Sequence, residues 1–106
     1  MGLTFKENCP DTRNSRSVDV YNELLKYNSK IDVYDPWVNK KECFREHSIK
    51  LVNLPKKNYY DAVIFLVAHK IFRDMSIKEV KSFGKKKFII YDAKYIFDKS
   101  LVDGRL

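Results

Sequence analysis

The feature that most constrains the fold is an apolar run from Asp61 to Ala68, with the sequence DAVIFLVA. Only its first residue is polar, so the run has no face that would turn toward water. Strands that are buried on both faces have this composition, and such strands belong to parallel sheets covered by helices on each side. The pattern therefore predicts a strand over 61–68 that is the most buried element of the chain.

Weaker patterns on both sides of this run predict the remaining elements. Three shorter segments are predicted strands: 31–34, 49–53 and 87–91. Two stretches with apolar residues at helical spacing are predicted helices: 15–28 and 72–83. Ser15 or Ser17 can cap the first helix, and 37–47 is compatible with a further short helix. Strands that alternate with helices predict an α/β fold with a mostly parallel sheet and helices on both faces.

The start of the chain fits this fold incompletely. A right-handed β-α-β unit needs a strand before its first helix, and residues 1–5 are barely long enough for one. We therefore expect residues 1–106 to be a single domain excised from a longer protein, with its first strand truncated. The length suits one globular core.

Composition limits the classes of function. No apolar run reaches the 18 residues of a membrane span, and the N-terminus lacks a secretory pattern, so we expect a cytoplasmic protein without membrane contact. Cys9 and Cys43 are expected to be free thiols. The net charge of +7 favours anionic partners, but the lysines form short clusters at predicted loops. A nucleotide ligand would account for part of this charge. The alternatives are a stand-alone basic α/β module that binds nucleic acid and a purely structural domain, although neither a basic helix nor an aromatic RNA-binding motif is present.

The strongest functional pattern lies before the first predicted helix. Gly2, Phe5-Lys6, Asp11 and Arg13 form a polar loop that delivers cations and backbone N–H groups to a helix N-terminus, where anions bind well. Ligands of α/β sheets collect at the carboxyl ends of the strands. Lys6 and Lys94 each follow a predicted strand, so we expect both to converge on one cleft at this edge.

These residues resemble the C-terminal domain of UDP-glucose/GDP-mannose dehydrogenases, in which a strand ends in G-x-x-F-K and D-x-R precedes a helix. Three later segments keep the same spacing: Tyr34-Asp35-Pro36, Tyr60-Asp61-Ala62-Val63 and Tyr91-Asp92-Ala93-Lys94. The resemblance covers essentially all 106 residues and implies a Rossmann-like sheet. FKENCPD and the closing D-x-K-Y are similar to the bacterial UDP-N-acetylhexosamine 6-dehydrogenases of surface-polysaccharide and capsule biosynthesis.

The resemblance implies an NAD-dependent enzyme that oxidises the C6 alcohol of a UDP-sugar, UDP-GlcNAc or UDP-GalNAc, to a carboxylate. It implies that Phe5, Lys6 and Lys94 bind the UDP-sugar and that Arg13 approaches NAD. NAD itself would be held mainly by a missing N-terminal domain. The family's catalytic cysteine lies upstream, so we expect no catalytic residue in this chain, which alone would be inactive. The full-length enzyme, with its N-terminal and central domains, is expected to be a homodimer.

Several of these residues have competing structural explanations. Arg13 can form a salt bridge with Asp11 instead of meeting a cofactor. Most of the family has arginine where Lys94 stands, and a lysine contact is less directional. Asp92 is expected to bond nearby backbone N–H groups. Cys9 has no neighbouring histidine to activate it and is not expected to be a nucleophile.

Three other polar residues have no predicted functional role. Asp35 ends a strand where dinucleotide-binding folds place an acidic residue, but only three glycines exist and none forms a G-x-G-x-x-G loop. We therefore interpret Asp35-Pro36 as a turn. His69 has no partner identifiable from the sequence, and His47, beside Glu46, is expected in a solvated loop. The histidines and cysteines show no metal-site spacing.

Overall fold

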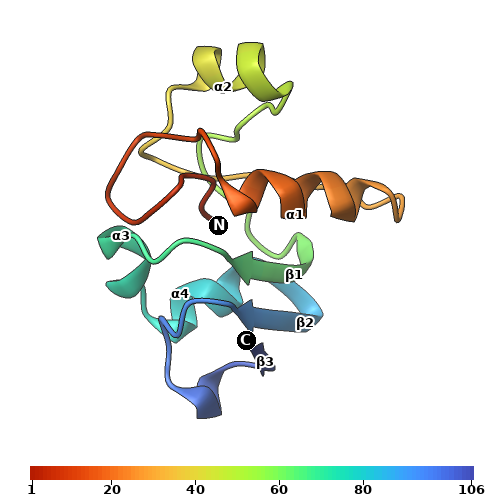
Figure 1. The fold of residues 1–106 in the computed structure, drawn as a ribbon. Helices are drawn as coiled ribbons and strands as arrows, with labels where there is room; N and C mark the ends of the chain where they lie inside the picture. The colour runs from red at the N-terminus through yellow and green to blue at the C-terminus, as the bar shows by residue number, and fades with distance from the viewer.

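The computed structural model describes residues 1–106 and contains four α-helices beside a three-stranded parallel sheet (Figure 1). In chain order the elements are α1 (Arg16–Leu25), α2 (Lys40–His47), β1 (Tyr60–Phe65), α3 (Lys70–Arg73), α4 (Ile77–Ser82), β2 (Gly84–Asp92), η1 (Lys99–Leu101) and β3 (Gly104–Arg105). The strand order is β1-β2-β3, with both pairs parallel. None of the helices has the length and apolar character needed to cross a membrane.

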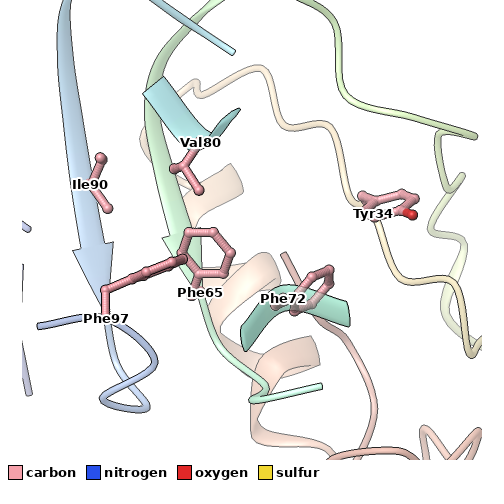
Figure 2. Close-up of a cluster of buried hydrophobic side chains, with 6 residues drawn as sticks. All are labelled: Tyr34, Phe65, Phe72, Val80, Ile90 and Phe97. Atoms are coloured by element: carbon pink, nitrogen blue, oxygen red, sulfur yellow. The ribbon is translucent and has the colours of Figure 1, made fainter. Parts of the chain in front are cut away.

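The regular half of the structure is built on β1 and β2. Their register runs from Ala62↔Ile89 to Phe65↔Asp92, with an irregularity between Tyr60 and Ala62. One face of this pair carries a cluster of buried side chains that α3 and α4 cover: Tyr34, Phe65, Phe72, Val80, Ile90 and Phe97 (Figure 2). Phe65 lies at its centre, with its ring 5.8 Å from Phe72 and 5.2 Å from Phe97.

The first half of the chain extends the same layer without regular strands. Met1 lies beside β1, since its amino nitrogen donates to the Ile64 carbonyl and its own carbonyl accepts from Leu66 N–H. Gly2 N–H donates in turn to the Tyr34 carbonyl, which places the segment 31–35 next to residues 1–3. A parallel bridge, Val33↔Leu51, adds the last segment.

Side chains in this first half alternate between two clusters. Val33 and Leu51 pack in a second buried cluster against α1 and α2, whereas the adjacent Tyr34 and Val52 pack in the cluster around Phe65. Neighbouring residues of an extended chain point to opposite faces. The layer therefore has helices on both faces, as the sequence predicted: α1 and α2 on one, α3 and α4 on the other.

The structure differs from the sequence prediction in four segments. The predicted strands 31–34 and 49–53 contain only the single bridge between Val33 and Leu51. Pro36 and Pro55 lack the N–H that a ladder needs, so neither segment can continue as a strand. The predicted helix 72–83 is two helices. Ser76 accepts a hydrogen bond from Glu79 N–H and begins α4 as a new helix.

The predicted strand 61–68 is shorter and less buried than expected. β1 ends at Phe65, and Asp61 and Ala62 are exposed at its start. Phe65, Val67 and Ala68 are buried. The face of β1 opposite α4 carries Ala62, which pairs in register with the exposed Ile89. Within residues 1–106, α1 and α2 cover the layer over the first half of the chain instead.

The complete layer has a switch point in its chain order. From one edge it runs 51, 33, 1–3, β1, β2, β3, so the chain first moves outward on one side of residues 1–3 and then on the other. In open α/β sheets, ligands bind at the carboxyl ends of the strands beside such a point. The loops after residues 1–3 and after β1 flank it directly.

Candidate functional site

The site begins where residues 1–3 pass close to the chain that follows β1. Gly2 has φ +95°, and a Cβ atom on it would lie 2.7 Å from the Val67 Cβ atom. Any other residue would clash with Val67 and strain the backbone. Glycine therefore brings Leu3 and Thr4 to the carboxyl edge of the layer, where both are buried.

Asp35 is the polar centre of this edge, and its side chain is completely buried. Its Oδ2 atom accepts hydrogen bonds from Leu3 N–H at 2.7 Å and Thr4 N–H at 3.3 Å. Its Oδ1 atom accepts from Trp37 N–H at 2.9 Å. Burial acts to raise the pKa of Asp35, but hydrogen bonds from His69, Leu3 and Trp37 outweigh it and hold the pKa below the usual 3.8.

His69 joins this carboxylate to the loop that carries Lys6. Its Nε2 atom lies 2.9 Å from Asp35 Oδ2 and 3.3 Å from Thr4 Oγ1. Its Nδ1 atom accepts a hydrogen bond of 2.9 Å from Asn8 N–H. The imidazole is fully buried and packs against Trp37 and Phe72, with ring centroids 6.2 Å and 5.3 Å away. This network connects three segments of the chain.

The loop between Thr4 and Arg13 presents the predicted substrate residues. Thr4 Oγ1 donates to the Lys6 carbonyl at 2.8 Å, and Phe5 N–H donates to the Asp11 carbonyl at 2.7 Å. Phe5 is nevertheless 58% exposed, and Lys6 is also exposed. An apolar ring and an ammonium group therefore face outward from a loop whose base is fixed.

Arg13 forms the salt bridge that the sequence left open as an alternative. Its Nε and Nη2 atoms each donate to Asp11 at 3.0 Å, although its side chain remains 81% exposed. The hydrogen bonds from Arg13 lower the pKa of Asp11. One edge of the guanidinium is therefore engaged, and the other edge is open to solvent.

Lys94 lies beyond the end of β2, on a turn held by Asp92. The buried Asp92 carboxylate accepts from Lys94 N–H at 3.1 Å and Phe97 N–H at 2.8 Å, as the sequence predicted. The Lys94 side chain is exposed. The ion pairs of the chain use other lysines: Lys26, Lys70 and Lys85.

The topology brings Phe5, Lys6 and Lys94 to the same edge of the layer. Residues 1–3 run parallel to β1, and β1 is parallel to β2, so the loops after all three leave from their carboxyl ends. His69 follows β1 and lies between the other two loops in this order. Arg13 is further along the first loop, two residues before Ser15, which caps α1.

Other candidates from the sequence lie apart from this network. His47 is at the end of α2 and not in a loop, and its ring bonds to Thr12 Oγ1 at 3.0 Å. Burial raises the pKa of Cys43, while Cys9 is partly exposed and free. No group of three or more His, Cys, Asp or Glu side chains is placed to hold a metal ion.

Sequence reasoning missed the pairing of Asp35 with His69. Asp35 does begin a turn, as predicted. It is also the hydrogen-bond partner of His69, which the sequence alone does not identify. Both residues follow predicted strands, and parallel strands place such residues at the carboxyl edge of a sheet. The order of the strands, which separates the two segments only by residues 1–3, would have been needed to pair them.

A layer in this order, with polar residues gathered beside its switch point, is the architecture of nucleotide-binding α/β domains. The UDP-glucose/GDP-mannose dehydrogenase family model, described as its UDP binding domain, matches residues 1–99. The chain belongs to this family. The resemblance seen in the sequence is therefore confirmed, and the alternative of a stand-alone nucleic-acid-binding or structural module has no support.

Individual relatives agree with this assignment. The chain is 46% identical over 106 residues to a UDP-N-acetyl-D-glucosamine 6-dehydrogenase from Salmonella typhi and 44% identical to one from Pseudomonas aeruginosa. Each alignment covers 100% of this chain and 25% of the relative. The chain thus spans about a quarter of the length of these relatives.

Solved structures of the family share the fold. A UDP-N-acetyl-mannosamine dehydrogenase from S. aureus superposes with a TM-score of 0.67 and 25% identity, over 98% of this chain and 24% of that one. A UDP-D-ManNAc dehydrogenase from Pyrococcus horikoshii gives a TM-score of 0.68 at 23% identity, over 98% and 23% of the two chains. The predicted α/β architecture is confirmed.

Proposed function

We propose that this domain binds the UDP-sugar of an NAD-dependent UDP-N-acetylhexosamine 6-dehydrogenase, which oxidises the C6 alcohol to a carboxylate for surface-polysaccharide biosynthesis in the cytoplasm. The observation that carries the proposal is the outward-facing Phe5-Lys6 pair, on a loop fixed at the switch point of the layer. The relatives at 44% and 46% identity are UDP-N-acetyl-D-glucosamine 6-dehydrogenases, which supports this substrate class.

Lys6 and Lys94 are suited to hold the diphosphate region of a nucleotide-sugar from two sides. Neighbouring strands lie about 4.8 Å apart, so the chain ends that carry these lysines, on either side of β1, are separated by roughly 10 Å. That span suits a diphosphate and the groups bound to it. An ammonium group provides a compact charge for a phosphate or a sugar oxygen, and Phe5 offers an apolar ring against which the ligand packs.

Arg13 is proposed to contact NAD, which other domains of the enzyme hold. The chain has no glycine-rich loop for the pyrophosphate, so its residues do not fit the dinucleotide as its main site. The free edge of the Arg13 guanidinium suits one anionic group of the cofactor. NAD would accept the hydride when bound, while Lys6, Lys94 and Phe5 orient the sugar.

The complete enzyme would contain this domain, the N-terminal and central domains, and a second subunit as a homodimer. Hydride chemistry and the catalytic cysteine would belong to the other domains. The residues described here contribute binding and orientation, which lower the barrier by holding the reacting groups in place. We therefore expect no turnover from residues 1–106 alone when NAD and UDP-GlcNAc are added.

Lysine substitutions test the proposal. In the full-length enzyme, Lys6→Ala should reduce turnover and Lys94→Ala should chiefly raise the substrate KM. Arg13→Ala should instead weaken the binding of NAD. A charge-assisted hydrogen bond contributes about 1.5–3 kcal/mol, so UDP affinity measured by calorimetry should fall roughly tenfold to a hundredfold for each lysine. Lys78→Ala, an exposed lysine on α4, is the matched control. Unchanged UDP binding in both lysine variants would exclude these residues from the site.

A further inference from the structure

The buried imidazole of His69 is bonded at both nitrogens by groups that fix its protonation. Asn8 contributes a backbone N–H, which can only donate, so Nδ1 must be the acceptor. Asp35 contributes a carboxylate, which can only accept, so Nε2 must carry the proton. The ring is therefore neutral and in one tautomer. A second proton on Nδ1 would face the Asn8 N–H and break that contact.

Thr4 completes the same arrangement from the other end of the loop. Its hydroxyl proton is donated to the Lys6 carbonyl, which leaves its oxygen to share the Nε2–H of His69 with Asp35. Asp35 also accepts the Thr4 N–H. The chain from Thr4 to Asn8 is thus tied at both ends to one buried pair.

The residues between these ties are the exposed ones. Phe5 and Lys6 lie between Thr4 and Asn8, and neither side chain contributes to the buried network. Asn8 has φ +54°, a left-handed conformation that asparagine adopts more readily than most residues. Two contacts hold it in place: its N–H donates to His69 Nδ1 at 2.9 Å, and its side chain accepts from Lys70 N–H at 3.0 Å. Loss of the His69 contact would remove one of the two and loosen the backbone that carries Lys6.

We propose that His69 is a positioning residue for the UDP-sugar site: held by Asp35 in its Nε2–H tautomer, it fixes the Thr4–Asn8 loop so that Phe5 and Lys6 meet the ligand preorganised. The proposal rests on the proposed function, since it assumes that Phe5 and Lys6 contact the UDP-sugar. A preorganised loop binds more tightly because less ordering entropy is lost on binding.

Two substitutions separate positioning from stability. In His69→Asn, the amide oxygen can take the place of Nδ1 and keep the Asn8 contact, but Asp35 loses its donor. In His69→Gln, the amide nitrogen can take the place of Nε2 and keep the Asp35 contact, but Asn8 loses its acceptor. The first variant should be the less stable of the two, because a buried charge is left short of a donor.

UDP affinity should follow the opposite order. We expect UDP binding to the full-length enzyme, measured by calorimetry, to weaken roughly fivefold to tenfold in His69→Gln, the equivalent of one lost hydrogen bond, and less than about twofold in His69→Asn. Stability is measured in parallel by urea denaturation. His47→Gln, which changes the other histidine, is the control. An affinity loss that follows the stability order, or equal losses, would overturn the positioning role.

A measurement on the unmodified enzyme keeps the proposal testable if a variant does not fold. Nitrogen-15 spectra of labelled histidine should show an unprotonated Nδ1 and a protonated Nε2 for His69, and the Asn8 amide should exchange its hydrogen slowly even without UDP. An Nδ1–H tautomer, or rapid exchange at Asn8 in the free enzyme, would refute it. A wild-type enzyme that does not bind UDP at all would instead refute the proposed function.

Discussion

The two halves of the layer are held together by different kinds of contact. In the second half, β1 and β2 pair through a backbone ladder from Ala62↔Ile89 to Phe65↔Asp92, and apolar side chains cover one face. In the first half, the extended segments share only the bridge Val33↔Leu51 and a backbone hydrogen bond from Gly2 N–H to the Tyr34 carbonyl. Buried polar side chains replace the ladder there, with Asp35 and Ser15 binding the backbone around Leu3.

This difference explains where the candidate site lies. A backbone ladder is insensitive to most side chains, whereas a network around one carboxylate depends on each of its members. We call the first half, held by the buried polar network, the network half, and the second half, built on β1 and β2, the ladder half. The loop that presents Phe5 and Lys6 belongs to the network half. Binding residues are commonly carried on loops that a rigid scaffold positions, and here β1 and β2 provide that scaffold.

Substitution of the buried carboxylates should show the contrast most strongly. Asp35 accepts three backbone N–H groups and pairs with His69, so an amide nitrogen in Asp35→Asn would face at least one donor. We expect it to lower the free energy of unfolding by about 3–5 kcal/mol, the usual effect of breaking a buried charged pair. Urea denaturation at neutral pH, followed by the fluorescence of the single Trp37, measures the loss.

Asp92 is the matched carboxylate of the ladder half. It is equally buried but accepts only two backbone N–H groups, from Lys94 and Phe97. Asp92→Asn should therefore lower the free energy of unfolding by only about 1–3 kcal/mol, because one of the two acceptors remains. A larger loss for Asp92→Asn than for Asp35→Asn would remove the distinction between the halves.

Acid should weaken the network half through the same carboxylate. The pKa of folded Asp35 lies below 3.8, which is its ordinary value. Its contribution to stability is therefore complete above pH 3.8 and is lost as the pH falls through the lower, folded-state pKa. The difference in unfolding free energy between wild type and Asp35→Asn should be constant near neutral pH and shrink below this value.

Two other carboxylates with lowered pKa values do not affect this difference in unfolding free energy. Hydrogen bonds from Arg13 and from Ser100 lower the pKa values of Asp11 and Asp98, respectively. Asp11 is partly exposed and Asp98 is exposed, and both are present in the wild type and in Asp35→Asn, so their contributions cancel in the difference. A difference that stays constant into acid would show that Asp35 does not stabilise the fold as a carboxylate.

The two halves also differ in how well the sequence predicts them. Periodicity located β2 and α1 to within a few residues, because burial of one face imposes a repeat on the sequence. It failed for 31–34 and 49–53, where the ladder stops after one bridge. Ser76 caps α4 and so divides the predicted helix 72–83. Periodicity is judged over many residues, so it does not detect a cap that depends on one residue.

The candidate site shows the same division. The motif around Phe5, Lys6 and Lys94 could be predicted because a family resemblance supplied it. The turn at Asp92 could be predicted because such carboxylates commonly bond nearby N–H groups. The pairing of Asp35 with His69 joins residues 34 positions apart. No local pattern encodes that contact, since it depends on which strand segments are neighbours.

The smallest contrast concerns the serines that cap one helix in each half. Ser15 accepts Ser17 N–H at the start of α1 and, being buried, also donates to the Leu3 carbonyl at 2.6 Å. Ser76 accepts Glu79 N–H at the start of α4 and is exposed. Loss of a cap costs about 1 kcal/mol, and an unpaired buried carbonyl adds about 1 kcal/mol more. Urea denaturation should therefore show a loss in Ser15→Ala about twice that in Ser76→Ala. Equal losses would mean that the hydroxyl of Ser15 stabilises only its helix and not the segment that leads to Lys6.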